Sequence, residues 1–249
     1  MRKKVALITG AAAGIGAACA KRIAQDGAMI GVLDLDEARC ADTVREVIAA
    51  GGKAVALGAD VSKRDQVQRA LRKCRETLGP INIVVNNAGV TDFTPFEEVT
   101  EELWDRVYRI NVLGTFIVTQ EVLPDMKASN WGRIVNISSS SAQTGANSMT
   151  TYSSSKGAIV TMTRSLAQEL GPLGITVNNV APGSIMGTIM SEANRERFQF
   201  PPEQLIKTLP VRRLGETADL ANAVAWLCLE DTAYFTGQTM GVNGGRVVS

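Results

Sequence analysis

Short apolar runs rich in β-branched residues alternate along this chain with longer segments whose apolar residues recur at helical spacing. The first run, at residues 5–8, is followed by a glycine-rich turn, an alanine-rich segment that ends near Gly27, and a second apolar run at 29–33. A short apolar run bounded by turn residues is typical of a buried strand, and the alanine-rich segment is typical of a helix. Residues 3–34 are therefore predicted to form one β-α-β unit.

The same alternation continues to the end of the chain. Helices are predicted at about 37–50, 63–78, 100–127 and 218–230, and another contains Tyr152 and runs to about Leu170. Strands are predicted at 53–57, 81–85, 133–137, 175–180 and 238–242, which makes seven strands in all. Right-handed crossovers between such strands produce a mostly parallel sheet. We therefore expect an α/β fold, a doubly wound Rossmann-type sheet flanked by helices, in a single domain that spans residues 1–249.

Glycine marks the predicted ends of several helices. It takes the left-handed conformation that closes a helix, and proline cannot continue one. We expect this ending at Gly27, Gly51-Gly52, Gly79-Pro80 and Gly171-Pro172.

Composition narrows the class of protein. Twenty-six basic and twenty-five acidic side chains leave a formal charge of +1, which predicts neither a nucleic-acid nor a membrane partner. The basic start followed by an uncharged run to Ala20 is similar to a secretory leader, but Gly10, Gly14 and Gly16 interrupt that run. No segment reaches the ~18 consecutive apolar residues that a membrane span needs.

The chain contains no histidine, which excludes histidine-based triads and metal sites. Its cysteines, Cys19, Cys40, Cys74 and Cys228, are too widely spaced for a zinc site or a disulfide framework. We expect buried, reduced thiols, a cytoplasmic protein and no metal.

The turn from Thr9 to Gly16 joins the first strand to the first helix. Gly10 permits the tight turn, Gly14 lets backbone amides approach a pyrophosphate, and Gly16 allows close helix packing. A glycine-rich turn alone can be purely structural, but its place between strand and helix favours dinucleotide binding.

Asp34 ends the second strand, where a carboxylate would accept hydrogen bonds from the adenosine ribose. A 2′-phosphate there would be repelled, and neither Ala13 nor Leu35 supplies a compensating positive charge. NAD is therefore predicted as the cofactor. The alternative role for Asp34 is a helix N-cap.

Tyr152 and Lys156 are four residues apart in a predicted helix and share one of its faces. An ammonium beside a phenol favours the phenolate, so Tyr152 is a candidate general acid and base. The alternative is an ordinary surface pair.

These motifs and several others occur in the order and spacing of the short-chain dehydrogenase/reductase family, which the chain resembles over essentially its whole length. The further motifs are Asp60-Val61, Asn86-Asn87-Ala88-Gly89, Asn111, the serines after Val135-Asn136-Ile137, Pro182-Gly183, Thr236-Gly237-Gln238 and Gly244-Gly245. The resemblance implies a cofactor site that comprises Gly10, Gly14, Ile15, Gly16, Asp34, Leu35, Asp60, Val61, Asn87, Ala88, Gly89, Tyr152, Lys156, Pro182, Gly183, Ile185 and Thr188.

The resemblance also implies the catalytic roles. Ser139, thirteen residues before Tyr152, would hydrogen-bond the substrate oxygen, and Tyr152 would pass the proton. Lys156 would bind the nicotinamide ribose, and Asn111 would hold a water that extends the proton path.

Two positions depart from the family pattern. Gly187 stands where a threonine usually contacts the nicotinamide, so either Thr188 takes that role through a one-residue bulge or the role is vacant. Asn243 stands where aspartate is commoner.

The leading hypothesis is an NAD-dependent oxidoreductase that interconverts a secondary alcohol and a ketone. A 3-oxoacyl thioester reductase is the alternative, although that activity usually uses NADPH and a basic residue at the Ala13 position. A cofactor-binding regulator without catalysis is a third, which the intact set of Asn111, Ser139, Tyr152 and Lys156 disfavours.

A long irregular segment at about 186–208 is predicted to form a substrate lid. Its apolar residues predict a neutral, medium-sized substrate, with cyclic compounds among the candidates, whereas Arg195 and Arg197 would suit an anionic one. The apolar residues are Met186, Ile189, Met190, Phe198, Phe200, Pro201 and Pro202, to which we add Phe93 and Met149.

An apolar group near the C-terminus could be core or interface, and the family resemblance implies a homotetramer that pairs there. The group is Trp226, Leu227, Leu229, Tyr234 and Phe235.

Overall fold

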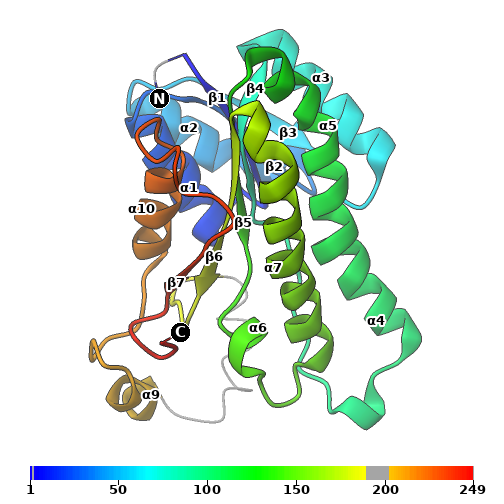
Figure 1. The fold of residues 1–249 in the computed structure, drawn as a ribbon, viewed down its shortest axis with the longest axis vertical. Coiled ribbons are helices and arrows are strands. Elements are labelled where there is room, and N and C mark those ends of the chain that lie inside the picture. The colour runs from blue at the N-terminus through cyan, green and yellow to red at the C-terminus, as the bar shows by residue number, and fades with distance from the viewer. Residues whose placement is uncertain (2, 189–201, 249) are drawn as a thin grey trace.

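Seven parallel strands form one sheet at the centre of the molecule (Figure 1). The computed structural model describes residues 1, 3–188 and 202–248. The strand order is β3-β2-β1-β4-β5-β6-β7 and every neighbouring pair is parallel, which confirms the predicted Rossmann-type fold. The strands are β1 (Val5–Thr9), β2 (Met29–Asp34), β3 (Ala54–Gly58), β4 (Ile81–Asn86), β5 (Gly132–Ile137), β6 (Ile175–Pro182) and β7 (Thr239–Val242).

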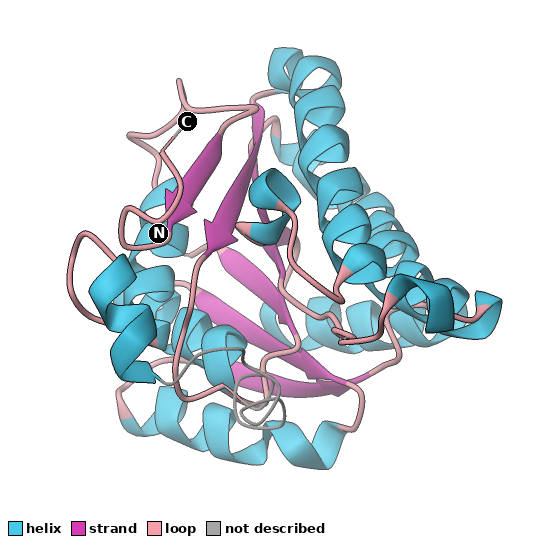
Figure 2. Cartoon of the chain, turned by 90° about the horizontal axis from the view of Figure 1, so that it is seen from below, coloured by secondary structure: helices cyan, strands magenta, loops and turns pink. Residues whose placement is uncertain are grey.

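Helices cover both faces of this twisted sheet (Figure 2). One face packs against α1 (Gly14–Gln25), α2 (Ala41–Ala49) and α10 (Thr217–Leu227), and the other against α3 (Arg64–Leu78), α5 (Gly114–Ser129) and α7 (Thr150–Leu170). Each face has its own apolar core, because the side chains of a buried parallel strand point alternately to the two helix layers.

The strand order reverses between β4 and β2, which pair with opposite edges of β1. The loops after β1 and β4 therefore separate to opposite sides and leave a crevice at the carboxyl ends of the strands. The described residues also form three short helices, α4 (Glu101–Tyr108), α6 (Ser141–Thr144) and α9 (Pro202–Thr208). In Figure 1, α6, α9 and the C-terminus lie at this end of the sheet.

Some predicted boundaries differ from the structure. The helix predicted at 100–127 is divided by a π-helical segment, Arg109–Leu113, and the helix predicted at 37–50 begins as a 3-10 turn, Glu37–Cys40. The left-handed endings at Gly27, Gly51 and Gly79 are confirmed.

The helix α7 ends at Leu170 with Gly171 as its C-cap, as predicted, but Gly171 does not take the left-handed conformation. Gly171 has a φ of −52° and continues into a 3-10 turn, Gly171–Leu173, because a proline is tolerated in the first turn of a helix. The left-handed residue is Gly174, with a φ of 71°.

The predicted lid is only partly described. Residues 189–201, which include Ile189, Met190, Arg195, Arg197, Phe198, Phe200 and Pro201, lie outside the described residues. The expectation of an irregular segment is wrong for Pro202–Thr208, which form α9. No helix in the described part of the chain is long and apolar enough to cross a membrane.

Candidate active site

The glycine-rich turn packs as closely as its sequence predicts. Gly10 and Gly14 have positive φ angles of 63° and 58°. A Cβ on Gly16 would lie 2.2 Å from the carbonyl oxygen of Gly10, so only glycine fits there. The amide of Asn87 donates to the carbonyls of Thr9 and Gly10, both at 2.9 Å, and ties the turn to the end of β4.

Asp34 lies beside this turn at the end of β2. Its carboxylate accepts hydrogen bonds from the backbone N–H groups of Ala12 at 3.1 Å and Leu35 at 2.9 Å. It is Asp36, not Asp34, that caps the following turn through Ala38. Arg39 was not predicted at this position. Its Nη1 lies 3.4 Å from Asp34 Oδ1 and places a positive charge beside the carboxylate.

Asp60 and Val61 follow β3 in a tight turn. The Asp60 carboxylate accepts from the backbone and the hydroxyl of Ser62, and Val61 packs against Gly114. The side chain of Leu35 is largely exposed. Adenine contacts by these residues stay predictions.

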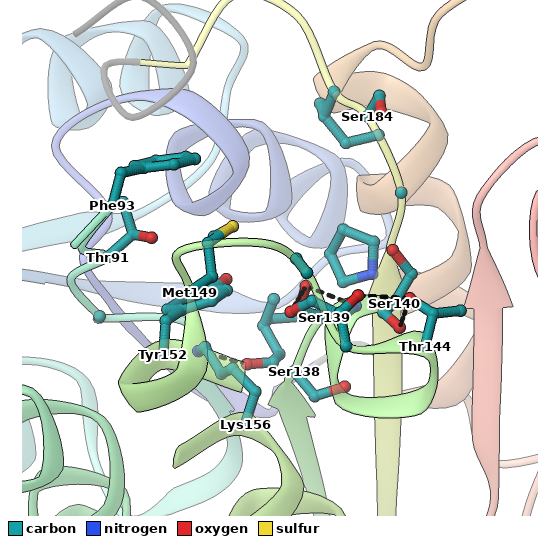
Figure 3. Close-up of a pocket in the computed structure, with 18 of the residues that line it drawn as sticks. Thr91, Phe93, Ser138, Ser139, Ser140, Thr144, Met149, Tyr152, Lys156 and Ser184 are labelled. Atoms are coloured by element: carbon teal, nitrogen blue, oxygen red, sulfur yellow. Dashed lines mark hydrogen bonds between the residues drawn. The ribbon is translucent and has the colours of Figure 1, made fainter. Parts of the chain in front are cut away.

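A cavity of about 660 Å³ opens at the carboxyl ends of the strands (Figure 3). It brings together ten of the predicted site residues from five separate segments. These are Ile15, Asn87, Gly89, Ser139, Tyr152, Lys156, Pro182, Gly183, Ile185 and Thr188.

Tyr152 and Lys156 extend from α7 into this cavity on the same side (Figure 3). The Lys156 Nζ lies 5.8 Å from the centre of the Tyr152 ring and donates to the carbonyl of Ile137 at 2.9 Å. Burial lowers the pKa of Lys156 to about 8, because an ammonium loses hydration there.

The sequence predicts that Lys156 favours the phenolate of Tyr152, but in this structure the neutral phenol is favoured. Burial raises the pKa of Tyr152, and an interaction with the Ser139 hydroxyl only partly opposes that shift. The physical reason is that the phenolate loses hydration, while the ammonium of Lys156 is hydrogen-bonded to Ile137.

Ser139 comes from the loop after β5. Its Oγ accepts hydrogen bonds from the backbone N–H of Ser141 at 3.1 Å and the Ser141 hydroxyl at 2.9 Å. Ser139 can therefore direct its own hydroxyl hydrogen toward a substrate oxygen.

Asn111 sits in the π-helical segment and does not line the cavity. Its amide donates to the carbonyl of Val90 and to Ser155 Oγ, both at 3.0 Å, and its Oδ1 accepts from the backbone of Val90 at 2.8 Å. Through these hydrogen bonds the Asn111 side chain joins the loop after β4 to α7. A Cβ on Gly89 would lie 3.0 Å from Asn111 Oδ1 and 3.3 Å from Lys156 Nζ, so the loop passes close above both.

The structure places Thr188 at the cavity. Gly187 has a φ of 71°, and the Thr188 side chain lies 3.6 Å from where a Gly14 Cβ would be. The contact between Thr188 and the nicotinamide stays a prediction.

The wall of the cavity is more polar than the sequence predicts. Phe93 and Met149 line it as expected, but Met186 does not and is 40% exposed. Further hydroxyl and amide side chains on α6 and the loops around it line the cavity too. The sequence singled out only Ser139 in this segment, because short polar side chains have no periodic signal. The further side chains are Ser138, Ser140, Ser141, Thr144, Asn147 and Ser148.

Comparison with known proteins identifies the family. A family model for short chain dehydrogenases matches residues 4–198. The chain belongs to the short-chain dehydrogenase/reductase family.

Similar members of this family differ in what their names say they act on. The (2S)-[(R)-hydroxy(phenyl)methyl]succinyl-CoA dehydrogenase subunit BbsD of Thauera aromatica is 39% identical over 99% of this chain and 97% of its own. The 3-oxoacyl-[acyl-carrier-protein] reductase FabG of Thermotoga maritima is 37% identical, over 98% of both chains. The crystal structure of an NAD+-bound xylitol dehydrogenase superposes with a TM-score of 0.92 at 31% identity, covering 98% of this chain and 99% of that one.

Proposed function

We propose that this short-chain dehydrogenase uses NAD(H) to interconvert a secondary alcohol and a ketone of medium size. One observation carries the proposal: Ser139, Tyr152 and Lys156 line the same cavity as Gly89 and Gly183. Proton-transfer groups and a glycine-lined dinucleotide site therefore face a common space.

The residues fit a dinucleotide. Gly14 has no side chain at the start of α1, where backbone N–H groups and the helix dipole favour a pyrophosphate. Asp34 offers its carboxylate to one ribose, and Lys156, which lines the cavity, offers its ammonium to the other. A bound nicotinamide would supply hydride chemistry, and the chain would supply position and proton transfer.

The side chains then act in one step. Alongside the hydride transfer that a bound nicotinamide would supply, the O–H proton of the alcohol passes to the deprotonated Tyr152 Oη. The Ser139 hydroxyl holds the reacting oxygen by a hydrogen bond. The Lys156 ammonium, once shared with a ribose, favours the deprotonated phenol that must accept the proton.

Removing the Tyr152 hydroxyl tests this function. Tyr152→Phe should lose at least ~100-fold in kcat while still binding NADH, since a positioned acid and base contributes ~100-fold or more. Turnover is followed at the NADH absorbance across a panel of secondary alcohols and ketones. Tyr234→Phe, at a fully exposed phenol, is the matched control and should be unchanged. Comparable turnover in Tyr152→Phe would contradict the assigned role.

A 3-oxoacyl thioester reductase is the second candidate, supported by the name of the Thermotoga maritima relative. If that activity requires NADPH, two residues argue against it. A 2′-phosphate beside Asp34 would be repelled by the carboxylate, and Ala13 supplies no positive charge to compensate. Faster reduction of acetoacetyl-CoA with NADPH than with NADH would move this candidate to first place.

We further propose a single domain, a cytoplasmic location and a homotetramer. The four cysteines are buried free thiols, as is common in a reducing compartment. Trp226, Tyr234 and Phe235 are partly or fully exposed apolar side chains near the C-terminus that a second subunit could cover.

A further inference from the structure

The cavity carries a positive charge that the proposed chemistry does not use. Two cationic side chains, Lys156 and Arg246, line it, whereas no aspartate or glutamate does so among the described residues. Lys156 is buried and assigned to the cofactor ribose, which leaves Arg246 for another group. A cavity lined by charges of one sign raises the local concentration of ligands of the opposite sign.

Neighbouring strand ends bring Arg246 to this place. β6 and β7 are parallel, with Pro182 opposite Val242, so the residues that follow both strands emerge at the same edge. Arg246 Nη1 donates to the hydroxyl oxygen of Ser184 at 3.2 Å. No carboxylate of the described residues forms an ion pair with Arg246, so the rest of its guanidinium donors remain open to a ligand.

Asn243 fixes the turn that presents Arg246. Its Oδ1 accepts from the backbone of Gly245 at 3.0 Å, and its Nδ2 donates to the carbonyl of Val247 at 3.2 Å. The Arg246 backbone also donates to the Asn243 carbonyl at 3.2 Å. An aspartate could accept but not donate, which gives a physical reason for asparagine at this position.

Ser184 lies across the cavity from Tyr152 (Figure 3). A group bound by Ser184 and Arg246 would therefore sit away from the reacting carbon, which Ser139 and Tyr152 define. If this contact is equally strong in the ground state and the transition state, its loss raises KM and leaves kcat nearly unchanged.

We propose that Arg246 and Ser184 bind an anionic substituent of the substrate, either a carboxylate or a phosphate. Arginine suits both groups, because its planar fork can donate two parallel hydrogen bonds to them. This inference rests on the proposed function and makes its substrate an anionic ketone or hydroxy compound, in place of the neutral one that the sequence predicts.

Steady-state kinetics with matched substrates tests the assignment. Acetoacetate and levulinate are compared with their methyl esters, and acetoacetyl-CoA with the acetoacetyl thioester of N-acetylcysteamine, which lacks the phosphates. The first comparison detects a carboxylate and the second a phosphate. Each is measured in wild type, Arg246→Gln and Arg246→Lys, with Arg45→Gln on the distant helix α2 as the exposed control.

In wild type, kcat/KM should favour the anionic member of at least one pair. Arg246→Gln should lower that preference by ~10-fold or more, mainly through KM, since hydrogen bonds between charged groups are stronger than those between neutral ones. Arg246→Lys should restore part of it, and Arg45→Gln should change nothing. The affinity for NADH should be the same in all variants.

Two results would overturn the inference: equal preference in wild type and Arg246→Gln, or a weakened affinity for NADH in Arg246→Gln. Calorimetric titration of the wild type and Arg246→Gln with acetoacetate and with coenzyme A separates this failure from that of the proposed function. Binding that depends on Arg246 without any turnover would contradict the proposed function and leave the anion site standing. Turnover of neutral ketones that is independent of Arg246 would support the proposed function and contradict the anion site.

Discussion

At the scale of single residues, burial and partners decide what each charged group can do. Asp34 offers its carboxylate toward the ribose position, but it also meets Arg39 at 3.4 Å. Arg39 is about half exposed, so water and salt screen its charge, whereas Asp34 is mostly covered. The negative charge of Asp34 should therefore outweigh the positive charge of Arg39 at the expected ribose position.

Cofactor preference follows from Asp34. We predict that NAD is favoured over NADP by ~100-fold or more in kcat/KM, which corresponds to ~2.7 kcal/mol in transition-state binding. Asp34→Ala should reduce that ratio, and Arg39→Ala should increase it by removing the compensating positive charge. Asp36→Ala is the control, because this residue caps the neighbouring turn. Equal use of both cofactors by the wild type would contradict the role of Asp34 in cofactor preference.

The affinity for NADH should depend on pH through Lys156. Its pKa is lowered to about 8, so the ammonium is present below that pH and is lost as the pH rises through it. A neutral amine makes the weaker hydrogen bond by about 1 kcal/mol, so Kd should rise ~5-fold above this range. Fluorescence titration of the wild type and Lys156→Met checks this, with Lys127→Met as the exposed control. The same pH dependence in Lys156→Met would assign it to another group.

At the scale of elements, buried side-chain hydrogen bonds hold the strands and helices around the site. Asn86 on β4 donates to Asn136 on β5 at 2.8 Å and to Thr119 on α5 at 2.9 Å. Asn136 in turn donates to Thr163 on α7 at 2.9 Å. Such bonds are costly to leave unmade in a buried position, so they fix the helices relative to the strand ends that carry the catalytic loops.

Asp92 lies where the loop after β4 meets the start of α7. Its side chain is buried, and it faces the backbone N–H of Tyr152 without forming a full hydrogen bond to any described residue. Burial raises its pKa, and the Tyr152 amide only partly opposes this. The positive end of the α7 dipole stabilises a carboxylate at this position, but burial deprives the carboxylate of hydration.

Replacing Asp92 should change stability in a pH-dependent manner. A carboxyl with a raised folded pKa binds its proton more tightly when folded, so the wild type gains stability as pH falls from that raised pKa toward the ordinary value. Asp92→Asn should therefore be more stable than the wild type by about 1 kcal/mol at neutral pH, because the amide carries no charge that loses hydration on burial. Urea unfolding at a series of pH values should show this difference disappearing in acid. Asp105→Asn, on the exposed side of α4, is the control, and a difference that stays constant with pH would contradict the explanation.

At the scale of the whole molecule, one stretch of surface is apolar enough to suggest contact between subunits. Trp226 on α10 and Phe235 before β7 meet edge to face, with ring centres 4.9 Å apart. Both rings are about 40% exposed, and Tyr234 beside them is fully exposed. Aromatic side chains in this arrangement are typical of the centre of an interface.

We predict a tetramer in analytical ultracentrifugation. Phe235→Lys should shift it toward dimers or monomers, because covering this surface would then bury an unpaired charge. Phe96→Lys replaces an aromatic ring that is 68% exposed in a different part of the chain and should leave the assembly unchanged. A wild type that sediments as a monomer would refute the prediction.

Much of this protein could be predicted from its sequence, because the relevant signals are local. The alternation of apolar runs and helical segments determined the seven strands and their helices. The positive φ angles of Gly10 and Gly14, and the close packing of Gly16, follow from the absence of a Cβ at those positions. The motif of Tyr152 and Lys156 likewise needs only the geometry of one helix.

Only the tertiary structure decided which distant residues meet. Ser184 and Arg246 are 62 positions apart and come together because β6 and β7 are parallel neighbours. The pairing of Asn111 with Val90 depends on how the π-helical segment sits under the loop after β4. The pKa directions of Tyr152 and Lys156 are opposite to what an exposed pair would have, because burial removes the water that stabilises both charged forms. Hydration and contact are properties of the folded chain, and no spacing along the sequence encodes them.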